Sequence, residues 1–170
     1  MINTASSENM NPTAPTEGLI RLINGEVIHP EEFDKILMSN CHYIHHVIVT
    51  GNDKPYPLAL IFPDSKLFSQ PDYAVTPLEG CFCPRDTQEL GKCLTGCMRL
   101  ANNELDNSLD RVQRGVIIND EFLFADGIPV MTDDEILEKY ARVIDDIYSG
   151  KLQMTNNLYY INSYQNGSHL

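Results

Sequence analysis

Four cysteines form the densest group of potential metal ligands in the sequence. They are Cys81, Cys83, Cys93 and Cys97, within the stretch CFCPRDTQELGKCLTGC. Four thiolates are the ligand number of a structural zinc site, but the spacing differs from the paired pattern that zinc sites usually show. Cys93 and Cys97 also share helical spacing with apolar residues, and buried cysteine is ordinary core material. We therefore predict no metal and keep these four residues as the candidate ligands if one binds.

Three histidines near Cys41 suggest a second possible metal site. They are His42, His45 and His46, in the run CHYIHHVIVTG. If this run is a strand, successive side chains point to opposite faces, so His45 and His46 cannot share an ion without distortion. We expect histidines that face solvent or pack on a sheet. No Ser-His-Asp or Cys-His arrangement stands out locally.

The sequence lacks the short motifs that bind nucleotide phosphates. It has no G-x-x-x-x-G-K-[ST], no G-x-G-x-x-G and no phosphate loop rich in Ser, Thr and Gly. Its 12 Lys and Arg against 24 Asp and Glu give a net charge of −12, which repels nucleic acid and anionic lipid alike. We predict neither nucleic-acid binding nor membrane insertion.

The junction GIPVMTDDEILEKY at residues 127–140 has the composition of a helix start. Thr132 and Glu135 fit the S/T-x-x-E capping box, in which each side chain accepts a hydrogen bond from the other residue's backbone N–H. Asp133 and Asp134 suit the positive end of the helix dipole. The pattern predicts a helix that begins after Thr132, a role that requires no chemistry.

The elements that position these residues are short and mixed. GLIRLI and EVIHP flank Asn24-Gly25, which predicts a β-hairpin with a type I′ turn. Pro30 predicts a helix start, and that helix should end near Asn40. YIHHVIVTG and YPLALIFPD indicate paired strands, and RGVIIND a third. Asp86 predicts the N-terminal cap of a second long helix. The apolar stripe from residues 136 to 147 predicts a closing helix.

Together these elements predict a small α+β domain with an N-terminal two-stranded hairpin and a three-stranded core sheet packed by about three helices. The length of 170 residues suits one domain. Residues 1–17 have the composition of a flexible tail, residues 18–150 form the domain, and residues 151–170 are a C-terminal tail with enough apolar residues to dock. No secretion signal or membrane span is evident, so we expect a cytoplasmic protein.

The stretch NGEVIHPEEFDKILMSNCHYIHHVIVTGNDKPYPLALIFPD resembles the start of the small C-terminal domain of acyl-CoA ligases, in the adenylate-forming superfamily. The resemblance extends from Leu19 to Tyr148 and is nearest to the long-chain fatty acid ligases. In that family a hinge of the type G-R-x-K-D/E joins this domain to a large N-terminal domain. Here the hinge falls on residues 14–18, with Pro15 at the Arg position and Gly18 at the acidic position, so the motif is absent.

The family also carries a motif of the type L-T-P-S-M-K, whose Lys reaches the ATP α-phosphate and the carboxylate during adenylation. Here IPVM stands where T-P-S-M would be. Thr132 therefore occupies the position of the catalytic Lys, and about two residues are deleted before the helix. The resemblance implies that the cation required for adenylation is missing, so we expect no catalytic residue.

Two functions follow from the resemblance. The first is a non-catalytic accessory module that acts through an acyl-activating enzyme's large domain, an acyl carrier protein or self-association, with no cofactor of its own. The alternative is the small subunit of a split acyl-CoA ligase that supports thioester formation, with ATP, Mg and CoA bound only in the complemented enzyme. In the family the turn corresponding to Asn24, Gly25 and Glu26 faces the active site in the thioester-forming state, so these residues are the candidate binding site.

Overall fold

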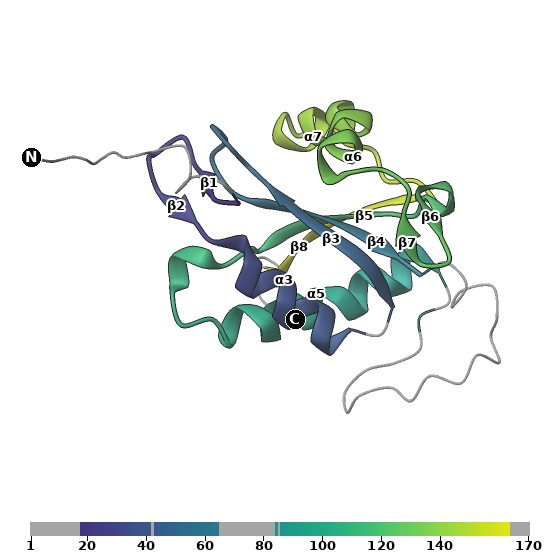
Figure 1. Ribbon diagram of the computed structural model, residues 1–170, viewed down its shortest axis with the longest axis horizontal. Helices are drawn as coiled ribbons and strands as arrows, with labels where there is room; N and C mark the ends of the chain where they lie inside the picture. Colours follow the sequence, from purple (N-terminus) through teal and green to yellow (C-terminus); the bar gives the residue numbers. More distant parts are fainter. Residues whose placement is uncertain (1–17, 42, 65–83, 85, 164–170) are drawn as a thin grey trace, which may run out of the picture.

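The computed structural model describes residues 18–41, 43–64, 84 and 86–163. Its centre is a four-stranded mixed sheet in the order β3-β4-β5-β8, with two small hairpins beside it. Figure 1 shows α3 and α5 on one face of this sheet and α6 and α7 on the other. Each face has its own buried apolar cluster. The predicted α+β class with an N-terminal hairpin is confirmed.

The central strands follow the predicted runs. β3 (Ile44–Thr50) pairs antiparallel with β4 (Leu58–Pro63), and β4 pairs parallel with β5 (Arg114–Ile118). All six residues of β4 are buried, as expected for an apolar strand covered on both faces. The parallel pairing requires a crossover, and α5 (Thr87–Asn103) lies within it.

The sheet has one strand more than the sequence predicted. Residues Leu158–Asn162, in the predicted C-terminal tail, form β8 and pair antiparallel with β5. Tyr159 of this strand packs against α5 at Gly91, where an added Cβ would lie 2.4 Å from the tyrosine ring. A glycine inside this helix therefore permits the close approach of β8.

The two helices on the α3 and α5 face begin at the residues that the capping signals predicted. α3 (Pro30–Asn40) buries Phe33 and Leu37. The Asp86 side chain caps α5 by accepting a hydrogen bond from the Glu89 backbone N–H at 2.8 Å. Cys93 and Cys97 are buried in the core cluster of this face, as the packing interpretation predicted. Cys81 and Cys83 lie outside the described residues.

The closing helix is divided in two, which the apolar stripe did not predict. α6 (Asp133–Lys139) and α7 (Ala141–Tyr148) meet at Tyr140, whose ψ of 18° departs from helical geometry. The Tyr140 ring packs 6.3 Å from Phe62, and its hydroxyl donates a hydrogen bond to Asp120. Side chains of both helices still pack on the sheet, so the stripe keeps one buried face.

The N-terminal hairpin is confirmed, but its predicted turn type is wrong. β1 (Ile20–Arg21) pairs with β2 (Val27–Ile28). A type I′ turn requires positive φ at both central residues, yet of the Asn24-Gly25 pair Gly25 alone has one, at 93°. The Gly25 N–H donates a hydrogen bond to the Leu22 carbonyl, and the Leu22 N–H donates one to the Glu26 carbonyl. The loop is therefore a three-residue connection that ends in glycine.

A second hairpin follows β5 and was not predicted. β6 (Phe124–Ala125) pairs with β7 (Ile128–Pro129) across Asp126 and Gly127, both with positive φ. Two short 3-10 helices, η2 (Ser108–Asp110) and η3 (Glu121–Leu123), complete the described elements. None of the described helices is long and apolar enough to cross a bilayer.

Candidate functional site

The start of α6 is the position at which the family resemblance places a catalytic lysine. Thr132 Oγ1 accepts a hydrogen bond from the Glu135 backbone N–H at 3.2 Å, and Glu135 Oε1 accepts one from the Thr132 backbone N–H at 2.9 Å. The predicted capping box is thus confirmed. Both side chains are committed to starting the helix, and neither supplies a cation.

An acidic cleft of about 490 Å³ lies beside this helix start. Its lining includes Glu31 and Asp34 of α3, Asp133 of α6, and Gly18 next to the first hairpin. None of the residues that line it is a lysine or an arginine. The one basic residue in the lining, His29, lies 3.2 Å from Asp110. Three carboxyl groups without a lysine or arginine therefore make this cleft unfavourable for a phosphate.

Asp34 has the most perturbed carboxyl group of the cleft. Its Oδ1 is buried and has no hydrogen-bond partner among the described residues. Burial, then the charge of Asp133 and then that of Glu31, raise the pKa of Asp34 from 3.8 to about 7. A substantial share of this side chain is therefore protonated near neutral pH.

Two histidines of β3 lie close to this region, and their predicted opposite orientation is wrong. The register of β3 against β4 shifts between Ile44 and His46, so His45 lies in a β-bulge. His45 stacks 5.2 Å from Phe124, His46 lies 6.3 Å from Phe62, and the two phenylalanine rings are 6.1 Å apart. The bulge thus brings both imidazoles to one aromatic cluster.

Each of these histidines also has a carboxylate partner. His46 Nε2 lies 2.7 Å from Asp133 Oδ1, and His45 Nε2 lies 3.4 Å from Asp64 Oδ1. His46 therefore faces the Asp133 carboxylate at the start of α6. Within the described part of the chain, no three His, Cys, Asp or Glu side chains are arranged to hold a metal ion. His42 lies outside the described residues.

Lys139 at the end of α6 is the first lysine after Thr132, and it already has an acidic partner. Its Nζ lies 2.9 Å from Asp120 Oδ2. Burial by itself would raise the pKa of Asp120, but hydrogen bonds from Tyr140 and Lys139 outweigh it and lower that pKa. Lys139 thus stabilises a local carboxylate at the opposite end of the helix from Thr132.

The turn at Asn24, Gly25 and Glu26 is exposed and internally hydrogen bonded. The Asn24 side-chain amide donates to Glu26 Oε1 at 3.0 Å, and the Glu26 backbone N–H donates to Asn24 Oδ1 at 2.9 Å. The preceding Ile23 is 71% exposed. The turn therefore presents a fixed polar tip next to an unburied apolar side chain.

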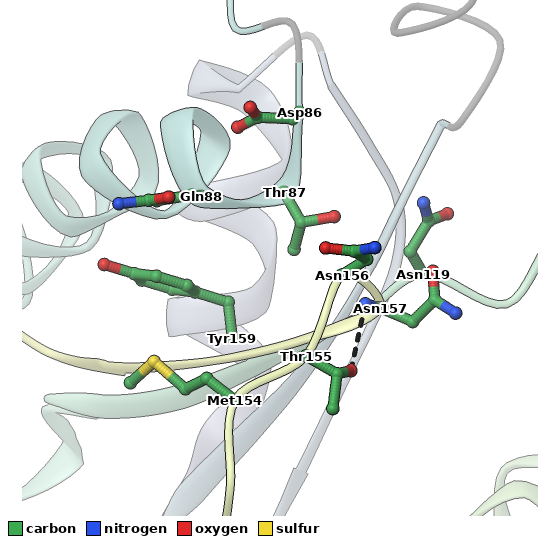
Figure 2. A pocket seen from close by; sticks show the side chains of 9 residues that line it. All are labelled: Asp86, Thr87, Gln88, Asn119, Met154, Thr155, Asn156, Asn157 and Tyr159. Atoms are coloured by element: carbon green, nitrogen blue, oxygen red, sulfur yellow. Dashed lines mark hydrogen bonds between the residues drawn. The ribbon is translucent and has the colours of Figure 1, made fainter.

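Sequence reasoning missed a polar cavity of about 690 Å³ between the start of α5 and the segment that leads into β8. Figure 2 shows amide side chains from separate elements around it, among them Gln88, Asn119 and Asn156. The Asn157 backbone N–H donates to Thr155 Oγ1 at 3.1 Å, which orders this segment. The Asn-rich run before β8 was the available signal, but its place in the fold depends on the docking of β8.

Comparison with known proteins agrees with the resemblance found in the sequence. Residues 17–77 match the family model described as AMP-binding enzyme C-terminal domain. The fold is similar to the A domain of a carboxylic acid reductase from Segniliparus rugosus, in complex with AMP and a co-purified carboxylic acid. That match has 12% sequence identity and a TM-score of 0.57, and it covers 80% of this chain and 20% of the other. No curated protein matches the chain in sequence.

Two further solved structures show the same similarity. The adenylation domain of a carboxylate reductase from Mycobacterium chelonae is 14% identical with a TM-score of 0.55, over 79% of this chain and 20% of that one. The A-PCP didomain of the Segniliparus rugosus reductase with AMP is 13% identical with a TM-score of 0.56. That match covers 79% of this chain and 18% of the other. This chain thus spans about one fifth of the proteins that it matches.

Proposed function

We propose that this chain, which is similar to the small C-terminal domain of adenylate-forming enzymes, is a non-catalytic accessory module that acts through protein contacts. The observation that carries the proposal is the use of Thr132 as a helix cap at the position of the adenylation lysine. Removing one group that stabilises charge in a transition state typically costs a factor of about 10² to 10³ in rate.

The surroundings of Thr132 also oppose nucleotide binding. Asp133 and Glu31 add negative charge to the cleft, and Asp34 adds more as it ionises. Lys139 is held by Asp120 and offers no substitute cation. A triphosphate at this helix start would meet repulsion where the parent family offers attraction. The sequence and the electrostatics of the cleft therefore support the same proposal.

An exposed apolar segment next to this site suits a protein partner. In the segment from η3 to the start of α6, the side chains of Phe122, Ile128 and Val130 are 83%, 67% and 58% exposed. Exposed apolar residues gathered in one short segment mark interaction surfaces more often than isolated ones do. The similar structures include the A domain within a longer chain, so a large adenylating domain is the partner that we propose first.

Calorimetry tests the catalytic side of the proposal. Two of the similar structures are described as complexes with AMP, so AMP and Mg-ATP are the nucleotides to titrate. We expect no saturable heat from the full-length chain. A dissociation constant in the micromolar range, about −8 kcal/mol, would contradict the proposal.

Affinity capture tests the partner side. The wild-type chain should capture an acyl-activating enzyme. The double variant Phe122→Asp with Ile128→Asp should not capture it, because two charges would have to be buried in the contact. Leu109→Asp is the matched control, since Leu109 is a 46% exposed apolar residue on η2. Equal retention of the enzyme by wild type and both variants would show that the segment is not the contact.

A second function has one specific observation in its favour. The turn at Asn24, Gly25 and Glu26 is exposed and ordered by its own hydrogen bonds, as a contact with a large domain would require. In a split acyl-CoA ligase, this turn would serve thioester formation while the large domain carries out adenylation. The long-chain acyl substrate remains a prediction from the family resemblance.

A preformed acyl-adenylate separates the two functions. With a candidate large domain and CoA, the split ligase predicts faster thioester formation on adding this chain and loss of that gain in Gly25→Val. A Cβ at Gly25 meets no atom within 4 Å, so valine acts there through the φ of 93° and not through a clash. Gly150→Val is the matched control, with a φ of 72° and the same open space. We expect no gain, whereas a turn-dependent gain would establish the split ligase.

A further inference from the structure

A third cavity combines three tyrosines with an arginine. It has a volume of about 430 Å³, within the range of small-molecule sites. Tyr56 precedes β4 and Tyr148 ends α7. Arg114 of β5 and Tyr160 of β8 are diagonal neighbours, since Arg114 pairs with Asn162 and Tyr160 pairs with Val116. The cavity therefore lies between α7 and the sheet face below it, whose elements can be followed in Figure 1.

The tyrosines of this cavity are ordered by one another. The rings of Tyr56 and Tyr148 have centroids 4.8 Å apart, and the Tyr148 hydroxyl donates to the Tyr56 carbonyl at 2.8 Å. The Tyr160 hydroxyl interacts with both Tyr56 and Arg114, which act on its pKa in opposite directions. Burial, followed by the neighbouring Tyr56, raises the pKa of Tyr160 to about 12, so its hydroxyl keeps its proton at neutral pH.

The Arg114 charge has no counter-ion among the described residues. Its guanidinium carbon lies 4.0 Å from the centroid of the Tyr56 ring, and no ion pair of the described residues includes it. Lys54 Nζ adds a second positive charge 5.3 Å from the Tyr148 ring. In a chain of net charge −12, this cavity is a local site of unmatched positive charge.

The remaining walls are apolar. Ile147 is buried, Leu152 is half-buried and the exposed Met154 lies at the edge. An arginine within an aromatic and aliphatic cavity suits a ligand with a planar apolar body and one carboxylate, because a guanidinium binds carboxylates through two parallel hydrogen bonds. Organic cations fit poorly, since Arg114 and Lys54 already lie over the rings. We propose that this cavity binds a small aromatic carboxylate.

In the bound state, the carboxylate contacts Arg114 and the Tyr160 hydroxyl while the ring of the ligand packs on the tyrosines. This inference does not depend on the proposed function, because none of the cavity's residues belongs to the acidic cleft or to the hairpin turn. It also differs from adenylation chemistry, since the cavity lies on the α7 side and involves no bond breaking. The site is one of recognition.

Chemical-shift titration of the full-length, ¹⁵N-labelled chain tests the proposal. Benzoate is the probe, and we expect saturable shifts at Arg114 and Tyr160 with a dissociation constant of about 1 mM, as for a ligand of this size. Acetate lacks the ring, benzyl alcohol lacks the charge, and benzyltrimethylammonium reverses it. Each of these should bind at least about tenfold more weakly. Equal or tighter binding of benzyltrimethylammonium, or of AMP, would overturn the assigned ligand class.

Two variants locate the site. Arg114→Gln should weaken benzoate about 10- to 100-fold, the loss expected for a hydrogen bond to a charged group. Arg142→Gln is the matched control, because Arg142 is an exposed arginine of α7 outside the cavity lining. Tyr160→Phe removes one hydroxyl and should weaken benzoate less than tenfold, which provides a test if Arg114→Gln fails to fold. Unchanged affinity for benzoate in a folded Arg114→Gln variant would refute the proposed site. If Arg114→Gln does not fold, unchanged affinity in Tyr160→Phe would refute it.

Discussion

The raised pKa of Asp34 makes the stability of this fold depend on pH in a direction that one substitution can test. The carboxyl group is largely buried beside Asp133 and Glu31, and its pKa is about 7 instead of 3.8. Between these values the folded protein retains a proton that the unfolded chain has lost. The stability that the neutral carboxyl confers is therefore complete below about pH 4 and is lost as the pH rises through 7.

The magnitude follows from that difference. At 1.36 kcal/mol for each pH unit, the change from 3.8 to about 7 corresponds to at most about 4 kcal/mol. Part of the side chain remains in contact with solvent, which screens the carboxylate and reduces this to about 1 to 3 kcal/mol. Asp34→Asn removes the ionisation and keeps the shape. The variant should match wild type at pH 4 and exceed its free energy of unfolding by about 1 to 3 kcal/mol at pH 8.

Urea denaturation of both proteins at pH 4, 6 and 8 measures this difference. Asp133 and its partner His46 are present in both proteins, so the comparison between variant and wild type isolates the effect of the Asp34 carboxyl group. Glu32→Gln, at an exposed position of the same helix, is the matched control; it removes a surface ion pair with Lys35 and should change the free energy of unfolding by less than about 1 kcal/mol. A stability difference for Asp34→Asn that stays constant from pH 4 to pH 8 would refute the burial argument.

Two further substitutions test local packing by denaturant midpoint. Thr132→Ala should lower the free energy of unfolding by about 0.5 to 2 kcal/mol because the Glu135 N–H loses its cap, whereas Thr132→Ser should retain it. Gly91→Ala should destabilise by about 1 to 3 kcal/mol because its Cβ would overlap the Tyr159 ring. Gly96→Ala, in the same helix but with open space around it, should gain up to about 1 kcal/mol, and equal effects at both glycines would disprove the contact.

The elements predicted correctly are those encoded by local signals. α3 begins at Pro30 and α5 after Asp86, because a proline or a capping side chain acts on backbone groups a few residues away. The apolar runs of β3, β4 and β5 are likewise contiguous in sequence. The cap of α6 at Thr132 was predictable for the same reason.

Two of the features that were missed depend on long-range packing. β8 pairs with β5, and its Tyr159 packs against α5 at Gly91, so both contacts join segments far apart in the chain. The bulge at His45 depends on pairing with β4, which alternation within one strand does not reveal. The second hairpin did carry a local signal, because Asp126-Gly127 is a favoured pair for a type I′ turn.

Asp34 gave no signal in the sequence because its environment is created by the docking of α6. On helical periodicity alone it is one more acidic residue of α3, next to the buried Phe33. Asp133, the first residue of α6, then brings a carboxylate to the same cleft. Neither residue is unusual by itself, and the raised pKa arises from their proximity in the folded chain.

The distribution of charge gives two separate sites of the fold opposite preferences for small anions. The cleft beside α3 and the start of α6 presents carboxyl groups, and Asp133 at the helix start also interacts favourably with the α6 dipole. The charge that stabilises the helix is thus unfavourable for a bound phosphate. The cavity under α7 instead presents Arg114 against the Tyr56 ring, and Lys54 lies outside its lining, near the Tyr148 ring. The two proposals together predict that an anionic ligand with an apolar body is repelled at the position of the family lysine and bound under α7. Recognition of such a ligand requires no adenylation chemistry.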